Sequence, residues 1–565
     1  MSFRGINTTV IQIRRQVFTE VARMAYANVK GEQANHLMRK IPYTIIPGEE
    51  GKLRKDIFLE RAIVEERVRL AMGLPTRRMD EHNSVVSGLE DASIADKYYD
   101  PPLVNVIKFA CNRCPEKLVK VSDLCQGCLA HPCMEVCPKK AITWESGRST
   151  IDQEKCIKCG RCATVCPYNA IVKTERPCAA ACGMGAIHSD ELGRAEIDYS
   201  KCVSCGQCIA VCPTGALREK DYIDEVLEAV ADPDKYVCVQ TAPSVRAALG
   251  EEFGYPMGTD VEGKMAAALR RIGFDKVFDT DFSADLTIME EAHEFLDRVQ
   301  NGGVLPMITS CSPGWIKYCE HYFPDMTEHL SSCKSPQQMF GAIAKSYYAE
   351  KMGIPKEKMV VVSVMPCTAK KFEIGRADEN GAGVPDVDIA ITTRELGRMI
   401  ERASIRFTDL PDEEFDMPLG LGTGAAVIFG ATGGVMEAAL RTAVEKLTGE
   451  ELAKLDFTDV RGIEGIKEAV YNVAGMDVKV AVVSGLKNAK ELLKKVKSGE
   501  AEYHFIEIMG CPGGCVNGGG QPQQPGYVRN TVDIRAKRAE VLYNLDKKNK
   551  IRKSHENPAI IELYD

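Results

Sequence analysis

The chain lacks any run of roughly 18 consecutive apolar residues, which is the length that a membrane-spanning helix requires. It also lacks an excess of positive charge, because 72 Lys and Arg residues stand against 80 Asp and Glu residues and give a formal net charge of −8. Proteins that bind nucleic acid usually present a strongly basic face. We therefore expect neither a membrane span nor a nucleic-acid partner.

The N-terminal residues also lack the pattern of a cleavable export signal. Arg14 and Arg15 form an arginine pair of the kind found in one class of export signal. However, Glu20 and Arg23 interrupt the apolar stretch that should follow, and no small-residue cleavage site comes after it. We therefore expect a cytoplasmic protein.

What the chain has in excess is cysteine, with 23 in 565 residues. In a short secreted chain that number would indicate disulfides. In a chain of this length, cysteines in tight Cys-x-x-Cys runs indicate metal binding in a reducing compartment. Sixteen of the cysteines fall between residues 111 and 212, and none lies in residues 1–100.

The length allows for three or four domains at roughly 150 residues each. Residues 1–100 predict a helical N-terminal segment, because LRKDIFLERAIVEERVRLAMGL (53–74) repeats apolar residues at helical spacing. We expect this segment to serve packing or docking. Asp100-Pro101-Pro102 marks a boundary, after which residues 101–220 hold the cysteine-rich part and residues 221–565 hold the remainder.

Residues 221–565 alternate strand-like with helix-like sequence, which predicts α/β layers. The clearest predicted strands are KMVVVSVMPC (358–367), VDIAITT (387–393) and VKVAVVSG (478–485). The glycine-rich stretch GLGTGAAVIFGATGGVMEAALR (420–441) lacks the preceding strand and the glycine spacing of a dinucleotide-binding loop. We expect its glycines to permit close packing of the backbone instead.

Two complete bacterial ferredoxin runs stand in the cysteine-rich part. In such a run, three cysteines spaced by two residues wrap one corner of a [4Fe-4S] cubane, and a fourth ligates the neighbouring cluster in two-cluster ferredoxins. The runs are Cys156-x2-Cys159-x2-Cys162-x3-Cys166-Pro167 and Cys202-x2-Cys205-x2-Cys208-x3-Cys212-Pro213. Structural zinc is the alternative, but zinc usually takes two separated Cys-x-x-Cys pairs.

The other eight cysteines of this part supply two further sets of ligands. One is a run with a longer middle loop, and the other consists of two half-motifs: Cys125-x2-Cys128-x4-Cys133-x3-Cys137-Pro138, then Cys111-x2-Cys114 with Cys178-x3-Cys182. Sixteen cysteines thus predict four accessory [4Fe-4S] clusters in a ferredoxin-like α+β domain. Which fourth ligand serves which cluster stays open. A cubane transfers one electron without acting on a substrate. Four clusters in one domain therefore predict an electron-transfer chain that serves a catalytic site.

Three motifs after residue 300 predict one more metal site. They are TSCSPGW (309–315), MPCTAKKFE (365–373) and EIMGCPGGC (507–515), the last of which continues to GGGQP (518–522). Each places cysteine near the end of a predicted strand, and the glycines would let the backbone approach a bulky ligand. The residues alone imply no more than this.

In order and separation, these motifs resemble the three signature motifs of the FeFe hydrogenases. The resemblance runs from about residue 220 to the C-terminus and extends to ITTREL, VRGIEGIKEA, HFIEIMG and RKSHEN. It implies an α/β two-lobed catalytic domain, with the metal site in its cleft, that interconverts protons, electrons and H2. The implied cofactor is a [4Fe-4S] cubane joined to a two-iron unit that carries CO, cyanide and a bridging dithiolate.

The resemblance also implies roles for individual residues. Cys367 and Cys511 would ligate the cubane, and Cys515 would be the ligand that bridges to the two irons. Lys370 would donate a hydrogen bond to a cyanide. Met365 and Met509 would pack around the two-iron unit.

The first motif departs from the family pattern, in which one of two adjacent cysteines relays protons and the other ligates the cubane. Here the pair is Cys311-Ser312, and Cys333 stands where the best-known members carry Ala. Since a cubane prefers four thiolates, we expect Cys333 or Cys311 to complete the set. The alternative is weak ligation by Ser312, with Cys333 a buried thiol.

A proton route is also implied by the resemblance. Glu291 and Glu294 lie three residues apart on one predicted helical face and align with the two glutamates that relay protons in the family. Ser331 would lie between them, and Cys311 would stand at the metal end. Without the family, two glutamates on a helix would indicate a solvated face.

We expect H2 and protons as substrates, a ferredoxin as electron partner, and maturation proteins that install the two-iron unit. Three alternatives remain open. A hydrogen sensor with the same cofactor would normally carry a sensory segment, which is not evident. An iron-sulfur assembly protein would lack the two-iron unit, which the intact Met365, Lys370 and GGGQP disfavour. A plain polyferredoxin would not need residues 221–565.

Overall fold

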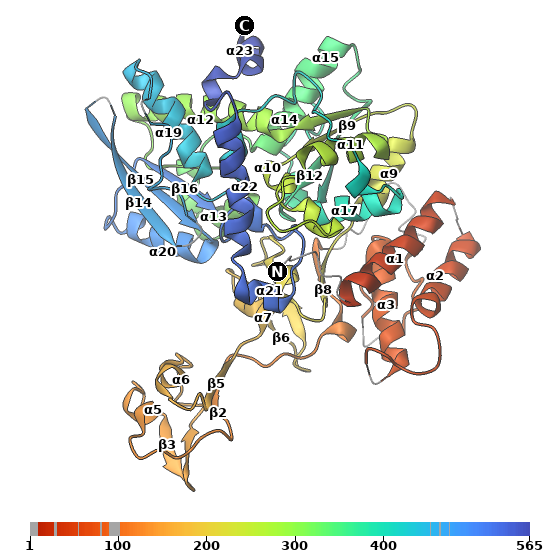
Figure 1. Ribbon diagram of the computed structural model, residues 1–565, viewed down its shortest axis with the longest axis vertical. Helices are drawn as coiled ribbons and strands as arrows, with labels where there is room; N and C mark the ends of the chain where they lie inside the picture. Colours follow the sequence, from red (N-terminus) through yellow and green to blue (C-terminus); the bar gives the residue numbers. More distant parts are fainter. Residues whose placement is uncertain are drawn as a thin grey trace.

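The computed structural model describes residues 9–27, 31–54, 56–78, 82–89, 102–452, 454–462, 465–473 and 475–565. Asp100 and Pro101, where we placed a domain boundary, lie outside the described residues. Two α/β bodies form the upper part of Figure 1, three N-terminal helices pack at their side, and the cysteine-rich part extends below them.

The N-terminal helices form a small bundle with its own apolar core. They are α1 (Thr9–Tyr26), α2 (Gly31–Ile45) and α3 (Ile57–Ala71). Buried side chains that include Phe18, Met38 and Val64 fill the space between them. The helix predicted within 53–74 is confirmed. It begins at Ile57 because Asp56 caps it by accepting a hydrogen bond from the Phe58 N–H.

The cysteine-rich part consists of one small α+β unit inserted into another of the same design. The inner unit contains β2 (Leu118–Val121), α5 (Pro132–Glu135), β3 (Ile142–Glu145), β4 (Arg148–Ile151), α6 (Arg161–Val165) and β5 (Ile171–Thr174). Its first and last strands, β2 and β5, pair with each other, and β3 pairs with β4. In Figure 1 this unit projects at the lower end of the molecule.

The outer unit repeats this order and pairing around the insertion. It contains β1 (Val104–Val106), the short 3-10 helix Lys108–Ala110, α7 (Pro177–Ala180), β6 (Ile187–Ser189), β7 (Ala195–Ile197), α8 (Gln207–Val211) and β8 (Leu217–Glu219). Here β1 pairs with β8, and β6 pairs with β7. The inner unit therefore interrupts the outer one between β1 and α7.

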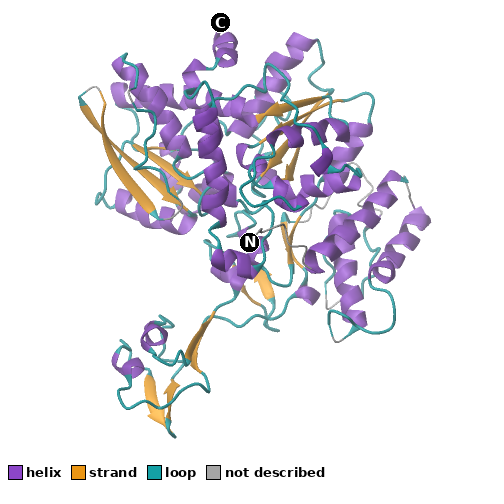
Figure 2. Cartoon of the chain, viewed as in Figure 1, coloured by secondary structure: helices purple, strands orange, loops and turns teal. Residues whose placement is uncertain are grey.

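Residues 221–565 form two sheets of four strands, each packed with helices (Figures 1 and 2). The first has the order β10-β9-β12-β13 and is wholly parallel: β9 (Tyr236–Thr241), β10 (Lys276–Asp279), β12 (Met359–Met365) and β13 (Ile389–Thr392). The second has the order β11-β16-β15-β14 and is parallel apart from the β14–β15 hairpin: β11 (Met307–Ile308), β14 (Ile466–Val473), β15 (Met476–Ser484) and β16 (Phe505–Met509). The three predicted strands are confirmed as β12, β13 and β15.

Helices of very different length connect and cover these strands. They are α9 (Ile223–Ala231), α10 (Pro243–Arg246), α11 (Glu262–Ile272), α12 (Thr280–Asn301), α13 (Pro313–Tyr322), α14 (Pro336–Ile343), α15 (Ala349–Met352), α16 (Lys370–Glu373), α17 (Thr393–Arg402), α18 (Gly424–Val427), α19 (Gly434–Thr448), α20 (Leu486–Lys497), α21 (Gly526–Thr531), α22 (Ile534–Lys548) and α23 (Pro558–Tyr564). The predicted mixed α/β content is thus confirmed. Within the described part, no helix combines the length and the apolarity needed to cross a membrane.

The glycines of residues 420–441 lie where backbone segments touch. A Cβ atom on Gly434 would lie 1.8 Å from the Ile428 carbonyl oxygen, and one on Gly433 would lie 2.1 Å from the Val460 carbonyl oxygen. Neither position has room for a side chain, which confirms the packing interpretation.

The strand ends bring the three signature motifs together. β11 ends at Ile308, β12 at Met365 and β16 at Met509, and the cysteine of each motif follows one of these ends within three residues. Ligand sites of parallel sheets form beyond the carboxyl ends of the strands. The fold therefore places the three cysteine-containing loops at one junction between the two sheets.

Candidate functional site

Three cysteines from the second and third motifs gather at this junction. The thiols of Cys367 and Cys511 are in hydrogen-bond contact, which lowers the pKa of Cys367 and raises that of Cys511. Burial raises the pKa of Cys515 to about 12, and Cys367 lies close enough to contribute. Cys511 is buried and Cys367 and Cys515 are half-buried. Three thiols in one place form a donor set suited to soft metal ions.

The glycines of the third motif let its loop lie directly on the second motif. A Cβ on Gly518 would lie 2.2 Å from the Pro366 carbonyl oxygen, and one on Gly514 would lie 2.7 Å from the Thr432 nitrogen. Since side chains cannot fit there, the loop that carries Cys511 and Cys515 is held against the backbone around it.

Lys370 is buried beside these cysteines and is fixed by several acceptors. Its Nζ donates to the Ser335 hydroxyl at 2.7 Å, to the Cys311 carbonyl oxygen at 3.2 Å, and to both carboxylate oxygens of Glu373 at 2.8 and 3.1 Å. Glu373 also accepts from Ser335 and Gln337, at 2.8 Å each. This network orients the ammonium group and partly balances its charge.

Met365 and Met509 occupy the last positions of β12 and β16 and are each 3% exposed. Met365 packs into the core of the first sheet, and Met509 packs into that of the second. The two methionines therefore flank the junction from opposite bodies.

The first motif places Cys311 and Ser312 differently from Cys333. Cys311 is half-buried, its partial removal from water raises its pKa, and it lies near Glu291, Lys370 and Cys515. The Ser312 hydroxyl accepts a hydrogen bond from the N–H of Gly510, the residue before Cys511, at 3.3 Å. Cys333 lies instead with its sulfur 3.9 Å from the Glu294 carboxylate. The structure thus brings Cys311 and Ser312 to the gathered cysteines and Cys333 to the glutamates.

The residues of the expected proton route follow one another inward along α12. Glu294 is half-buried, accepts from the Ser331 hydroxyl at 3.1 Å and pairs with Arg298 at 2.6 Å. Glu291 is fully buried, and burial raises its pKa to about 7. Within the described part, neither carboxyl oxygen of Glu291 has a hydrogen-bond partner. The charge of Glu291 contributes to the raised pKa of Cys311, so the two groups are neighbours.

Sequence reasoning missed several buried residues that support the site. Glu373 stands three residues after Lys370, a helical spacing that could have identified it as the partner of the ammonium group. Glu507 opens the third motif as part of β16 and accepts from the N–H groups of Gly433 and Met436 at 2.7 Å each. Burial raises its pKa to about 7. Glu507 thereby ties the start of α19 to β16.

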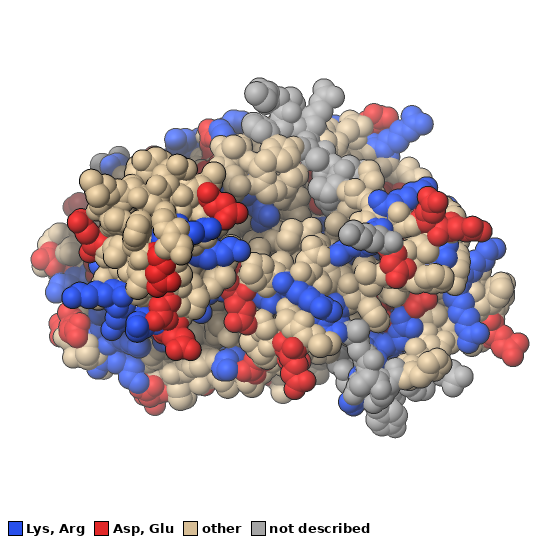
Figure 3. Space-filling model, turned by 90° about the horizontal axis from the view of Figure 1, so that it is seen from below, with Lys and Arg blue, Asp and Glu red and all other residues tan. Residues whose placement is uncertain are grey.

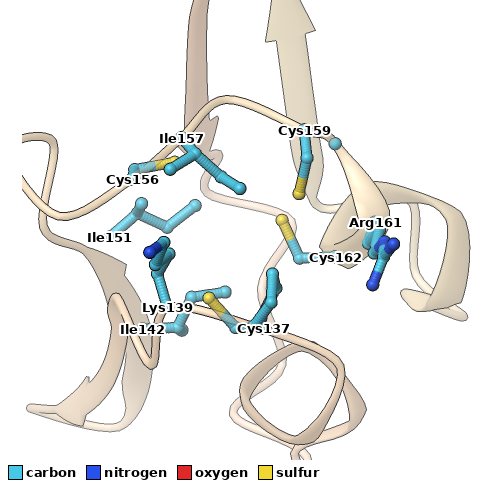
Figure 4. A pocket seen from close by; sticks show the side chains of 11 residues that line it. Cys137, Lys139, Ile142, Ile151, Cys156, Ile157, Cys159, Arg161 and Cys162 are labelled. Atoms are coloured by element: carbon cyan, nitrogen blue, oxygen red, sulfur yellow. The ribbon is translucent and has the colours of Figure 1, made fainter.

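In the inner unit, eight cysteines surround two separate cavities. Cys137, Cys156, Cys159 and Cys162 turn their sulfur atoms toward one shared space (Figure 4). Cys125, Cys128, Cys133 and Cys166 line a second cavity. Each run therefore contributes three cysteines to one cavity and its fourth cysteine to the other.

The outer unit shows the same exchange of the fourth cysteine. Cys114 has its pKa raised by burial, with Cys111 and Cys212 nearby, and Cys178 has the same two neighbours. Cys182 instead lies near Cys202, Cys205 and Cys208. The half-motifs therefore do not form one site together. They are a single ferredoxin run that the inner unit splits between Cys114 and Cys178.

These four groups of four cysteines fit [4Fe-4S] clusters. All the cysteines are free thiols. The fourth cysteine of every run accepts a backbone N–H···S hydrogen bond: Ala141 to Cys137, Ala170 to Cys166, Ala186 to Cys182 and Ala216 to Cys212, at 3.3–3.4 Å. Such bonds stabilise thiolate ligands and tune the potential of a cluster.

One outer-unit group lies directly against the signature motifs. The charge of Cys205 contributes to the raised pKa of Cys511, and the Thr368 hydroxyl donates to the Ser204 carbonyl oxygen. A Cβ on Gly519 would lie 2.1 Å from the Cys205 carbonyl oxygen. The group of Cys182, Cys202, Cys205 and Cys208 is therefore the neighbour of the site at the strand ends.

Comparison with known proteins agrees with this arrangement. Residues 235–519 match the C-terminal domain of the iron-only hydrogenase large subunit, residues 532–565 match the iron hydrogenase small subunit, and residues 149–172 and 195–218 match the 4Fe-4S binding domain. The NADP-reducing hydrogenase subunit HndD of Solidesulfovibrio fructosivorans is 56% identical over 423 residues, which are 73% of this chain and 70% of that protein. Iron hydrogenase 1 of Clostridium pasteurianum is 46% identical over 430 residues, 76% of this chain and 74% of that protein.

The fold is also similar to a solved structure, that of a variant of apo FeFe hydrogenase HydA1 from Chlamydomonas reinhardtii. The sequence identity is 45% and the TM-score is 0.54, over 61% of this chain and 94% of that one. The cysteine groups of the nested units fit four accessory clusters, and three further thiols lie at the junction of the signature motifs. This chain belongs to the FeFe hydrogenases, iron-sulfur oxidoreductases that interconvert protons, electrons and H2 at a cubane joined to a di-iron unit.

Proposed function

We propose that electrons travel between an external partner and the active site through the inner unit and then the outer unit. The observation that carries this order is the contact between the Cys205 loop and the signature motifs, described above. The inner unit projects away from the two α/β bodies, where a partner can reach it (Figure 1). We further propose that residues 1–100, 101–220 and 221–565 are the helical, ferredoxin-like and two-lobed catalytic parts of this enzyme.

At the active site, Cys367, Cys511 and Cys515 would hold the cubane, with Cys515 as the bridge to the di-iron unit. When bound, that unit supplies the iron centre at which H2 is made or split. Lys370, held in place by Glu373 and Ser335, would hydrogen-bond a cyanide. Met365 and Met509 would exclude water from the two sides.

For the fourth cubane ligand, the contacts favour the first motif over Cys333. Ser312 stands beside Gly510, and Cys311 is a neighbour of Cys515, whereas the sulfur of Cys333 faces Glu294. We therefore assign Cys333 to proton delivery. Cys311 or Ser312 would then complete the cubane.

Protons would enter at Glu294 and Cys333, whose sulfur faces the Glu294 carboxylate, pass Ser331 to Glu291, and reach Cys311 at the metal end. Each group in this order can both accept and donate a proton. Since Glu291 has a pKa near 7, it can take up and release protons near neutral pH with little energetic penalty.

A ferredoxin is the partner that we propose, and maturation proteins would install the di-iron unit. On the face of Figure 3, seen from the end where the inner unit projects, Lys and Arg are interspersed with Asp and Glu over most of the surface and gather at the lower left. The relative HndD is named a subunit of an NADP-reducing hydrogenase, so a complex with further subunits is the second candidate. We place the protein in the cytoplasm, because most of its cysteines stand in tight runs that fit metal binding in a reducing compartment.

A cluster ligand in the inner unit offers a test of this electron path. In the full-length enzyme, Cys159→Ser should lower H2 production from reduced ferredoxin several-fold more than production from reduced methyl viologen, which is small enough to reach other clusters. Equal losses with the two donors, or no loss with ferredoxin, would contradict the proposed path.

A further inference from the structure

The N-terminal bundle covers one particular cluster site of the outer unit, that of Cys111, Cys114, Cys178 and Cys212. Leu70 and Ile63 of α3 pack in one apolar cluster with Cys111 and Cys212. Leu70 is 2% exposed. The bundle thereby covers the Cys111 and Cys212 side of this site with apolar side chains, and electrostatic interactions are stronger where water is excluded.

The same bundle brings two arginines to the turn that follows Cys212. The Arg67 guanidinium donates to the Gly215 carbonyl oxygen at 2.9 Å. The Arg14 guanidinium donates to the carbonyl oxygens of Gly215 at 3.4 Å and of Leu217 at 3.1 Å. Gly215 has a φ of +59°, and a Cβ there would lie 3.2 Å from Arg14 and 3.3 Å from Arg67, so a glycine lets both approach.

The other three cluster sites provide an internal comparison. The turns after Cys137, Cys166 and Cys182 also place a residue of positive φ three positions on, namely Lys140, Asn169 and Gly185. Among the described residues, no side chain donates to the carbonyl oxygen of any of these three. The paired guanidiniums are thus a property of the Cys212 turn rather than of the repeated design.

Arg67 and Arg14 carry buried charge without a carboxylate partner. They are 3% and 7% exposed, and within the described part no carboxylate oxygen lies within 4.0 Å of either guanidinium. One nitrogen of each, Nη1 of Arg67 and Nε of Arg14, also lacks a hydrogen-bond partner there. Burial lowers the pKa of both, and Cys212 is among the groups that oppose this change.

Other charges surround the pair but do not neutralise it. Glu219 attracts Arg14, yet its carboxylate is bound by Arg394 at 2.8 and 3.0 Å. Arg218 and Arg398 lie nearby as well, and the carboxylate of Asp221 is shared between them at 3.2 Å each. A buried cation without a counterion is strongly unfavourable. An anion at the Cys212 site would supply the missing compensation.

A [4Fe-4S] cluster with four thiolate ligands is such an anion, with a net charge of −2 when oxidised and −3 after it gains one electron. We propose that Arg67 and Arg14 stabilise the reduced form and raise the reduction potential of the Cys111–Cys114–Cys178–Cys212 cluster. The electron that reduces it comes from a reduced inner-unit cluster and leaves to the Cys182–Cys202–Cys205–Cys208 cluster. Both arginines are positioning residues, and the inference rests on the accessory-cluster part of the proposed function.

The test is a redox titration of the full-length protein followed by electron paramagnetic resonance, with Cys111→Ser used to assign the signal. Arg67→Gln should shift the midpoint potential of this cluster to a more negative value and leave the other clusters unchanged. Arg67→Lys, which keeps the charge, should restore most of the shift. Arg61→Gln is the matched control, because Arg61 lies on the same helix and binds the carbonyl oxygens of Ile46 and Gly48.

An unchanged potential in Arg67→Gln, or an equal shift in Arg67→Lys, would overturn the inference. If Arg67→Gln loses the cluster by iron analysis, Arg14→Gln makes the same comparison. Loss of the cluster in Arg14→Gln and Arg67→Lys as well would make the arginines structural anchors and would also overturn it. H2 turnover is measured separately, since failure of the active-site assignments would remove turnover without moving this potential.

Discussion

At the scale of single residues, Glu291 offers the sharpest test of the proton route. Glu291→Gln keeps the shape of the side chain and removes its transferable proton, so turnover should fall by about 10²–10⁴-fold while the infrared bands of the active site persist. Because burial raises the pKa of Glu291 to about 7, its protonated fraction falls as the pH rises through 7. The variant should therefore lose the inflection near pH 7 in the rate of H2 production.

The control for that experiment is Glu290→Gln on the same helix. Glu290 is exposed and accepts a hydrogen bond from Tyr564 rather than from the route. We expect it to retain normal turnover. A Glu291→Gln enzyme that runs at full speed would show that protons take another path.

Substitution of Cys333 and substitution of Cys311 should have different effects on the active-site cubane and on turnover. Cys333→Ala should keep the active-site cubane and slow proton delivery, because its sulfur faces Glu294. Cys311→Ala should abolish turnover, since Cys311 lies between Glu291 and Cys515. Iron analysis and infrared spectra of the two variants provide the measurement. Loss of the cubane in Cys333→Ala would instead make Cys333 its ligand.

Single residues also mark the limit of sequence reasoning at the site. The motif cysteines and Lys370 could be named from the sequence because the three motifs resemble those of the FeFe hydrogenases, whereas the residues alone indicated only a metal site. Ser335, Gln337 and Glu507 could not, since each is an ordinary polar residue whose burial and partners depend on contacts between distant segments.

At the scale of elements, the loop after β16 carries Cys515, the ligand that we propose as the bridge to the di-iron unit. Cys515→Ala should remove the CO and cyanide infrared bands and all H2 turnover, because the di-iron unit would lose its bridge to the protein. The accessory clusters lie on other elements and should keep their paramagnetic signals. Turnover that survives this substitution would refute the bridging role.

The nested units show why the clusters could be counted but not paired from the sequence. The spacing of the runs depends on local turn geometry, which a sequence records directly. The exchange of Cys137 with Cys166, and of Cys182 with Cys212, depends on how two runs face each other in space. Because the inner unit separates Cys114 from Cys178, the sequence did not show that these cysteines belong to one ferredoxin run.

Residue ranges could be predicted for strands that are apolar and continuous, and none was predicted for β11. β12 has a nearly continuous run of buried aliphatic residues, which is typical of a central parallel strand. β11 contains only Met307 and Ile308, yet it positions the first motif through its pairing with β16. Two residues are too few for any periodicity to appear in the sequence.

At the scale of the whole molecule, the metal content tests the cluster assignments together. Protein produced without di-iron maturation should contain five cubanes, four in the nested units and one at the strand ends. Iron and acid-labile sulfide analysis gives the count directly. A content of only two or three cubanes would remove the outer-unit sites and with them the proposed electron path.

The C-terminal residues show how the parts of the molecule are joined. Residues 532–565, which match the iron hydrogenase small subunit, contain α22 and α23 and pack against the large-subunit part. Arg538 of α22 pairs with Glu251 at 2.7 Å, and Asp546 pairs with Arg441 at 2.9 Å, all of them buried. The sequence showed this region as part of one catalytic domain, because nothing in its composition sets it apart.

The most direct test of the central claim is infrared spectroscopy of the full-length protein after maturation of its active site. CO and cyanide bound to iron absorb where proteins have no bands of their own. The account predicts bands of both ligands, changing when H2 is added, in a sample that also turns over H2. A fully matured sample that contains the accessory clusters but shows no CO or cyanide bands would contradict it.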